Sequence, residues 1–134
     1  MEDLWPNDLA PAAVKSPLAI LKEQGVALGE KTRGLVTGSV SQIPSGADPR
    51  FTYKFYIESA PLRYRYDLFM VNQPVELYPV EVLLNGDLAE ELLHEERGRL
   101  MANDEEEFLE ILKRIFNAEK TRKVVSALLA QVNA

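Results

Sequence analysis

The chain has 134 residues and contains no cysteine, one histidine (His94) and one tryptophan (Trp5). The lack of cysteine excludes disulfide bonds, thiolate metal sites and cysteine nucleophiles. A serine nucleophile needs a base and an orienting group, and neither a Gly-x-Ser-x-Gly elbow nor a glycine-rich phosphate loop occurs. We therefore expect no cofactor, no metal and, on balance, no catalytic activity.

Long apolar runs are also missing. The longest purely apolar stretches are a few residues, whereas a membrane-spanning helix needs about 20. The first residues, "MEDLWPNDLAPAAVKSP", place acidic groups where a secretory signal has a basic start. Together with the absence of cysteine, these features predict a cytoplasmic protein.

Charge is unevenly distributed along this acidic chain, which has a net charge of −6. Residues 31–66 contain six basic residues and two acids, whereas residues 87–119 contain eleven acids and four basic residues. We expect a charge dipole, which favours association with a charged partner or with another copy of the chain. The alternative is that both regions are simply solvated faces without a partner.

The length fits one domain with its own core. Residues 1–16 include Pro6 and Pro11 and show no sustained period, so we expect an extended or partly ordered segment, followed by a single domain over 17–134. We expect Trp5 to fold back and anchor this segment on the domain. The alternative is a short motif that binds a partner.

The first half of the domain begins with a predicted helix. Ser16 is a plausible N-cap and Pro17 suits the first helical position, while Gly25 and Gly29 predict that the helix ends or bends early. Gly38 suggests a bulge or a close approach of another backbone. The expected strands, separated by loops such as 44–50, are 32–43, 51–59, 63–71 and 77–86.

Two features locate the fourth strand and the helix after it. Pro79 lacks a ladder donor and predicts an edge strand or the start of a strand. Asp87 and Glu90 have the spacing of a capping box at the beginning of a helix over 87–97. A short fifth strand is expected at 98–103.

The C-terminal part is expected to be helical. Asn103 and Glu106 repeat the capping-box spacing before a helix at 105–116, and a last helix at 119–132 carries an apolar stripe. That stripe must be covered by the chain's own sheet or by a second subunit. The fold class is therefore α+β, with an N-terminal helix, a four- to five-stranded, mainly antiparallel sheet and C-terminal helices packed on one sheet face.

The stretch "FTYKFYIESAPLRYRYDLFMV" (residues 51–71) holds seven of the ten Phe and Tyr residues. Alternation in its first strand predicts a core face that includes Phe55 and an opposite face that includes Tyr56. In its second strand, Phe69 falls with the charged residues. We therefore predict a partly exposed interaction surface made of Lys54, Tyr56, Arg63, Arg65 and Phe69.

Other clusters have ordinary structural explanations. Glu90 and His94 are four residues apart, as in a helical metal site, but without a second histidine a solvated helix face is favoured. Asp104 to Glu107 fit the positive N-terminus of a helix without a calcium ion. Glu58, Asp67 and Glu81 are compatible with a paired-carboxylate mechanism, which nothing else supports.

Three functions fit these observations. In size, charge and element order the chain resembles small bacterial secretion chaperones and toxin-neutralising immunity proteins, which implies a non-catalytic protein-binding module, with a homodimer possible. The first alternative is a single-stranded nucleic-acid-binding protein that uses the aromatic and basic face of the 51–71 hairpin. The second is a small enzyme or ligand carrier with a cleft between sheet and helices.

Overall fold

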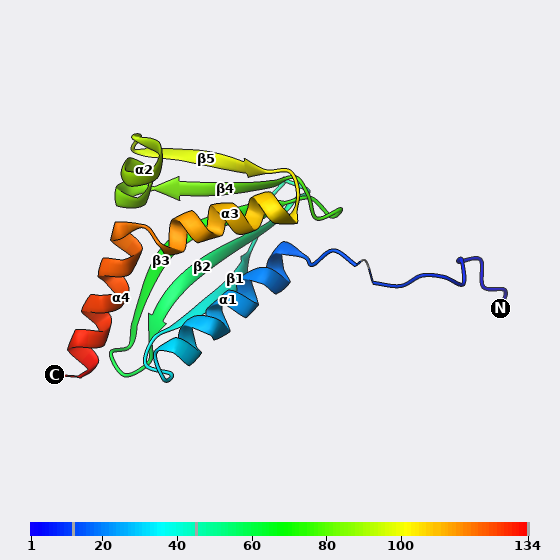
Figure 1. The fold of residues 1–134 in the computed structure, drawn as a ribbon. Helices are drawn as coiled ribbons and strands as arrows, with labels where there is room; N and C mark the ends of the chain where they lie inside the picture. Colours follow the sequence, from blue (N-terminus) through cyan, green and yellow to red (C-terminus); the bar gives the residue numbers. More distant parts are fainter. Residues whose placement is uncertain (12, 45, 134) are drawn as a thin grey trace.

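The computed structural model describes residues 1–11, 13–44 and 46–133; residue 45 of the expected loop lies outside the described residues, as do residues 12 and 134. The sheet contains five antiparallel strands in the order β1-β2-β3-β4-β5, and the helices lie in front of it in Figure 1. The predicted α+β architecture is confirmed. The elements are α1 (Pro17–Lys31), β1 (Thr37–Ile43), β2 (Phe51–Ser59), β3 (Tyr64–Gln73), β4 (Val80–Asn85), α2 (Gly86–Leu93), β5 (Arg97–Ala102), α3 (Glu105–Phe116) and α4 (Glu119–Val132).

The core lies between the helices and one face of the sheet. Phe55 of β2 stacks on Phe69 of β3 with ring centroids 5.3 Å apart, and Phe116 of α3 contacts both rings at 5.4 and 6.2 Å. Phe55 and Phe69 are 2% and 4% exposed. Because burying a large apolar side chain contributes about 1.5–3 kcal/mol, these rings are a main link between α3 and the sheet.

Helix α1 begins where the sequence predicts, since the Ser16 hydroxyl accepts a hydrogen bond from the amide of Ala19 at 3.1 Å. The expected early end at Gly25 is wrong, because α1 continues to Lys31. A Cβ atom at Gly25 would lie 2.7 Å from the carbonyl carbon of Gly38 in β1. Gly25 therefore allows α1 to pack closely on β1. The close approach of another backbone that was predicted at Gly38 is confirmed.

The starts of β1 and β4 lie later than predicted, while both ends of β3 and β5 and the end of β4 differ by one or two residues. β1 begins at Thr37 rather than 32, because Arg33 and Gly34 have φ values of 56° and 80° and form a turn after α1. Pro79 directly precedes β4, which lies between β3 and β5. The strand-start interpretation of Pro79 is thus confirmed and the edge interpretation is wrong.

The capping box predicted at α2 does not form, and the one predicted at α3 is displaced. The N-cap of α2 is Asn85, so Asp87 lies within the first turn. At α3 the Asp104 carboxylate accepts from the amide of Glu107 at 2.8 Å, and the amide of Asn103 donates to the Glu107 carboxylate at 2.7 Å. The reciprocal box therefore exists one residue later than the spacing predicted.

The apolar stripe of α4 is covered by the chain's own domain. Leu128 is 5% exposed and belongs to the core, and Val124, Val125 and Leu129 pack against it. A second subunit is therefore not needed to cover this helix.

The N-terminal segment leads away from the domain (Figure 1). Trp5 is 75% exposed, so the expected anchoring of Trp5 on its own domain is wrong. Pro6 and Pro11 fix their φ angles and restrict the residues before them, which favours an extended backbone here. Leu4 and Leu9 are exposed as well, at 84% and 69%.

Candidate interaction surface on the helix-free face of the sheet

In the part of the chain that the structure describes, all helices lie on the face of the sheet that carries Phe55 (Figure 1). The opposite face, which we call the helix-free face, carries the alternate residues of each strand. Its polar character follows from this position, because a sheet face without a covering layer is solvated. The charged strand residues on it are Lys54, Glu58, Arg65, Asp67, Glu81, Arg97 and Arg99.

A β-bulge in β3 changes the predicted faces of the hairpin. Phe55 pairs with Phe69 and Tyr56 pairs with Asp67, so Leu68 is an extra residue between them. One inserted residue reverses the alternation, which returns Phe69 to the core face. The placement of Phe69 on the exposed surface is therefore wrong.

Tyr56 and Arg65 do lie together on the helix-free face, as predicted. The Arg65 guanidinium stacks 4.4 Å from the centroid of the Tyr56 ring, and the Lys54 ammonium lies 5.9 Å from it. Arg65 also donates to the Glu58 carboxylate at 2.7 Å, and Lys54 pairs with Asp67 at 3.2 Å. These contacts leave Tyr56 only 8% exposed, so its ring is covered rather than presented to a ligand.

Arg63 does not join this cluster. It lies in the turn between β2 and β3 with φ of 51°, and its amide donates to the carbonyl of Ala60 at 3.1 Å. Lys54 lies five residues before the end of β2, so at about 3.3 Å per residue roughly 16 Å of strand separates it from this turn. The structure therefore brings Lys54, Tyr56 and Arg65 together and leaves Arg63 in the turn, outside the contacts of Lys54 and Arg65 with the Tyr56 ring.

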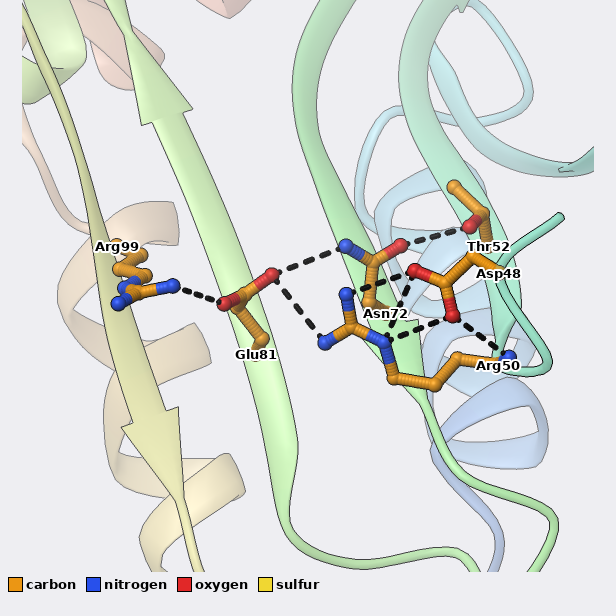
Figure 2. A network of polar contacts seen from close by, with 6 residues as sticks. All are labelled: Asp48, Arg50, Thr52, Asn72, Glu81 and Arg99. Carbon is orange, nitrogen blue, oxygen red and sulfur yellow. Dashed lines mark hydrogen bonds and ion pairs between the residues drawn. The ribbon is translucent and has the colours of Figure 1, made fainter. Parts of the chain in front are cut away.

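A polar network crosses the same face from the β1–β2 loop to β5 (Figure 2). At its centre, Glu81 accepts hydrogen bonds from Asn72 at 3.0 Å and from Arg99 at 2.9 Å, and lies 3.5 Å from the Arg50 guanidinium. Asn72 accepts in turn from the Thr52 hydroxyl at 2.7 Å. The six residues of the network are Asp48, Arg50, Thr52, Asn72, Glu81 and Arg99.

Glu81 is charged in this environment although its side chain is only 9% exposed. The hydrogen bond from Asn72 is the main cause that lowers the pKa of Glu81 below its usual 4.5, and burial opposes it, with Arg99 and Arg50 lowering it further. Three donors, from the β1–β2 loop, β3 and β5, converge on this one carboxylate. We therefore interpret the network as a clamp between strands rather than as a catalytic group.

The clamp lies where the sheet is weakest. β3 pairs with β4 through only three residue pairs, Met70 with Leu83, Val71 with Val82 and Asn72 with Glu81. Residues 64–69 of β3 do not pair with β4. Figure 1 shows this part of β3 bending away from β4 and β5. We call this divergence the fork.

A groove of about 470 Å³ occupies the fork, and we call it the fork groove. Its floor is apolar and includes Leu68, Met70 and Leu83. Arg97 and Arg99 of β5 line one side, and the Lys54–Asp67 ion pair lines the other. The groove therefore combines an apolar floor with a basic rim.

A second groove, of about 420 Å³, opens on the helix side between α1 and the pair α3–α4, and we call it the helix groove. Its floor includes Phe55, Ile57 and Leu68, and its charged lining residues are Lys31 and Lys113. No carboxylate, histidine or serine lines it among the described residues, so it lacks an acid–base pair.

Within the described ranges, no group of three or more histidine or carboxylate side chains is placed to hold a metal ion. His94 is the C-cap residue of α2, with φ of 57°. No helix of the described residues has the length and apolar character to cross a membrane. Comparison with protein-family models, with curated proteins and with solved structures finds no match.

The sequence prediction included a fifth strand at 98–103 but did not name Arg97 and Arg99 as residues of the candidate site. The segment "RGRLMA" places Arg97 and Arg99 two positions apart, which puts both on one face of a strand. That signal was present in the sequence. The pairing of β5 with β4, which brings these arginines beside Leu83 and Glu81, depends on strand order and was not predicted.

Proposed function

We propose that this chain is a non-catalytic protein-binding module of the chaperone-like or neutralising type, and that its fork groove binds an acidic segment of another protein through carboxylates that flank an apolar side chain. The supporting observation is the fork groove itself, with its apolar floor and arginine-lined rim. Apolar burial supplies affinity at such sites, and charge supplies orientation and specificity. A cytoplasmic location and a bacterial source stay predictions from the sequence.

The balance of charges on the helix-free face supports an acidic ligand. Each of the four carboxylates in this region forms an ion pair. The pairs are Asp48 with Arg50, Glu58 with Arg65, Asp67 with Lys54, and Glu81 with both Arg50 and Arg99. Arg97 makes no ion pair with any described residue, and it lines the fork groove. A carboxylate of the ligand can therefore accept hydrogen bonds from the Arg97 guanidinium without displacing a carboxylate of the protein.

The nucleic-acid alternative loses its stacking platform. Binding of single strands relies on exposed aromatic rings and on a basic path for the backbone. Phe69 is buried and the ring of Tyr56 is covered by Arg65, so neither can stack on a base in this arrangement. The alternative then depends on charge alone, which predicts binding that is weak and steeply dependent on salt.

The proposal is tested by affinity capture from a lysate of the source organism, with half of the sample treated with nuclease. The groove variant is Leu83→Glu combined with Arg97→Glu, and the matched control is Lys22→Glu combined with Lys123→Glu, two exposed lysines that line neither groove. Both variants change the charge on exposed or half-buried positions only.

We expect a stoichiometric protein that survives nuclease, binds the control variant and is lost from the groove variant. Recovery that is equal for the two variants would exclude the fork groove as the binding site. Recovery that disappears with nuclease would favour nucleic acid instead of protein.

A further inference from the structure

The helix groove has the properties of a docking site for an extended apolar segment. Its floor is formed by the buried side chains of Phe55, Ile57 and Leu68, and its walls come from α1, α3 and α4. Leu109 of α3 lines it and is 43% exposed, which is unusual for a large apolar side chain on a helix with a well-separated polar face. The groove therefore offers apolar surface that no described residue covers.

The rim of this groove is basic in a chain of net charge −6. Lys31 at the end of α1 and Lys113 in α3 both line it, and neither makes an ion pair with a described residue. Two unpaired ammonium groups beside an apolar floor favour a ligand that carries carboxylates next to large apolar side chains.

The N-terminal segment of the chain has that composition. Residues 1–11 contain Leu4, Trp5 and Leu9, which are 84%, 75% and 69% exposed. The same eleven residues contain three acids, Glu2, Asp3 and Asp8, and no lysine or arginine. An exposed tryptophan is costly in water, since the ring offers about 150–250 Å² for burial.

We propose that the helix groove binds residues 1–11 of a second copy of this chain, so that two copies exchange their N-terminal segments. Reciprocal exchange makes each contact twice and closes the assembly as a dimer. This interaction uses the helix side of the sheet. Leu68 lines both grooves, but Leu83 and Arg97 line only the fork groove and Lys31 and Lys113 only the helix groove, so variants at these residues test the two proposals separately.

The start of α1 directs the segment away from its own groove. The Lys15 amide donates to the Glu105 carboxylate at 2.9 Å, and the Lys15 ammonium pairs with Glu23 at 3.0 Å. Ser16 is extended, with φ of −70° and ψ of 150°, because the residue before a proline avoids the helical region. The segment therefore leaves the domain outward (Figure 1), where a second copy can reach it.

The helix groove is also better placed than the fork groove to receive the segment. The segment leaves the domain from α1, in the helix layer, and the helix groove opens within that layer. The fork groove opens on the other face of the sheet. Two copies that face each other through their helix layers can exchange segments directly, without passing them around a sheet edge.

Trp5 provides a direct measurement because it is the only tryptophan of the chain. We would record the emission maximum of Trp5 in the full-length protein over a thousandfold range of concentration, together with the molar mass from analytical ultracentrifugation. We expect the emission to move to shorter wavelength as the mass doubles, with one midpoint for both changes. An emission typical of exposed tryptophan at all concentrations would overturn the proposal.

A mixing experiment separates the two halves of the contact. One variant loses the segment (Leu4→Ser with Trp5→Ser), and the other loses the rim charges (Lys31→Glu with Lys113→Glu). The first variant contains no tryptophan, so in a mixture all emission reports the segment of the second. We expect each variant alone to be monomeric at the concentration where wild type is half dimeric. Adding an excess of the tryptophan-free variant, whose groove is intact, should then move the Trp5 emission of the rim variant to shorter wavelength.

Matched variants decide the site. Because both reversed charges occur in each of the two exchanged contacts, the rim variant should weaken dimerisation by about a hundredfold. The variant Lys22→Glu with Lys123→Glu should leave it within about twofold. Dimerisation lost in the fork variant Leu83→Glu with Arg97→Glu but not in the rim variant would overturn the assignment to the helix groove. A shifted emission that is independent of concentration in a monomer would show docking within one chain and would also overturn the exchange.

Discussion

Replacement of Glu81 by glutamine tests whether the polar network holds the two parts of the sheet together. Glu81 lies at the third of the three residue pairs that join β3 to β4, and its carboxylate accepts from Asn72 at 3.0 Å and from Arg99 at 2.9 Å (Figure 2). Glutamine keeps the size of the side chain but has one acceptor oxygen and an amide that donates. One of the two short hydrogen bonds is therefore lost and a donor is turned towards another donor.

The expected loss follows from these bonds. A hydrogen bond to a charged group contributes about 1.5–3 kcal/mol, and removing one partner of a buried pair costs more than the pair itself contributes. The Arg99 side chain is 70% exposed and that of Arg50 is 37% exposed, so water replaces part of the lost interaction. We expect Glu81→Gln to lower the free energy of unfolding by about 2 kcal/mol and the melting temperature by about 6–10 °C.

The dependence on pH identifies the carboxylate as the cause. The pKa of Glu81 is lowered in the folded state, mainly by the hydrogen bond from Asn72, so its contribution to stability is present above the usual pKa of 4.5 and is lost as the pH falls through the lowered value. Urea unfolding of wild type and Glu81→Gln between pH 3 and 8 should therefore give a constant difference above pH 5. Below pH 4.5 the difference should decrease.

The control is Asp67→Asn, which removes one ion pair from the same face. The Asp67 side chain is 60% exposed and pairs only with Lys54, so we expect a loss below about 0.5 kcal/mol. A loss of similar size for both variants, or a Glu81→Gln difference that does not change with pH, would refute the interpretation of the network as a clamp.

Three further substitutions test the packing. Gly25→Ala should lower the free energy of unfolding by more than about 2 kcal/mol in chemical unfolding, because the new methyl group meets the backbone of Gly38. Gly29→Ala places its methyl group only against the side chain of Thr37 and should change the free energy of unfolding by less than about 1 kcal/mol. Equal effects would contradict the close contact between Gly25 and Gly38. Phe69→Ala should cost about 3–5 kcal/mol in the same assay, and a loss below 1 kcal/mol would return this ring to the surface. Burial raises the pKa of Tyr78 to about 12, so Tyr78→Phe should remove a transition near pH 12 from an alkaline absorbance titration. The same substitution should not lower stability at pH 7, because the buried hydroxyl has no described hydrogen-bond partner, and a loss above about 1 kcal/mol would reveal one.

The element order and fold class were predictable because periodicity and caps act over a few residues. Ser16 with Pro17 begins α1, and the acids before residue 108 begin α3, as the sequence indicates. The strand faces were predictable only where pairing is regular. In β2 the alternation gives the observed faces, but in β3 the extra residue Leu68 reverses them, and only the pairing partner reveals a bulge.

The candidate site was harder to predict because its residues come from strands that are distant in the sequence. Glu81 is joined to Arg50 and Arg99 across intervals of 31 and 18 residues. Local patterns contain no information on such contacts. Tyr56 with Arg65 was predictable, since a hairpin with a short turn places positions on adjacent strands in register.

The structure gives a physical meaning to the uneven charge of the sequence. The basic residues of the 31–66 region on the helix-free face are already neutralised by carboxylates of that face, so their excess over acids does not by itself make a binding site. Among the described cations without an ion pair, Arg97 lies beside the fork groove, and Lys31 and Lys113 lie beside the helix groove. Both grooves have apolar floors, so both proposals assign them the same kind of ligand, an acidic segment with an exposed apolar side chain. Residues 1–11 are one such segment within the chain itself, and they leave the domain from the helix layer. Exchange of these residues would occupy the helix groove and leave the fork groove open for a partner of similar composition.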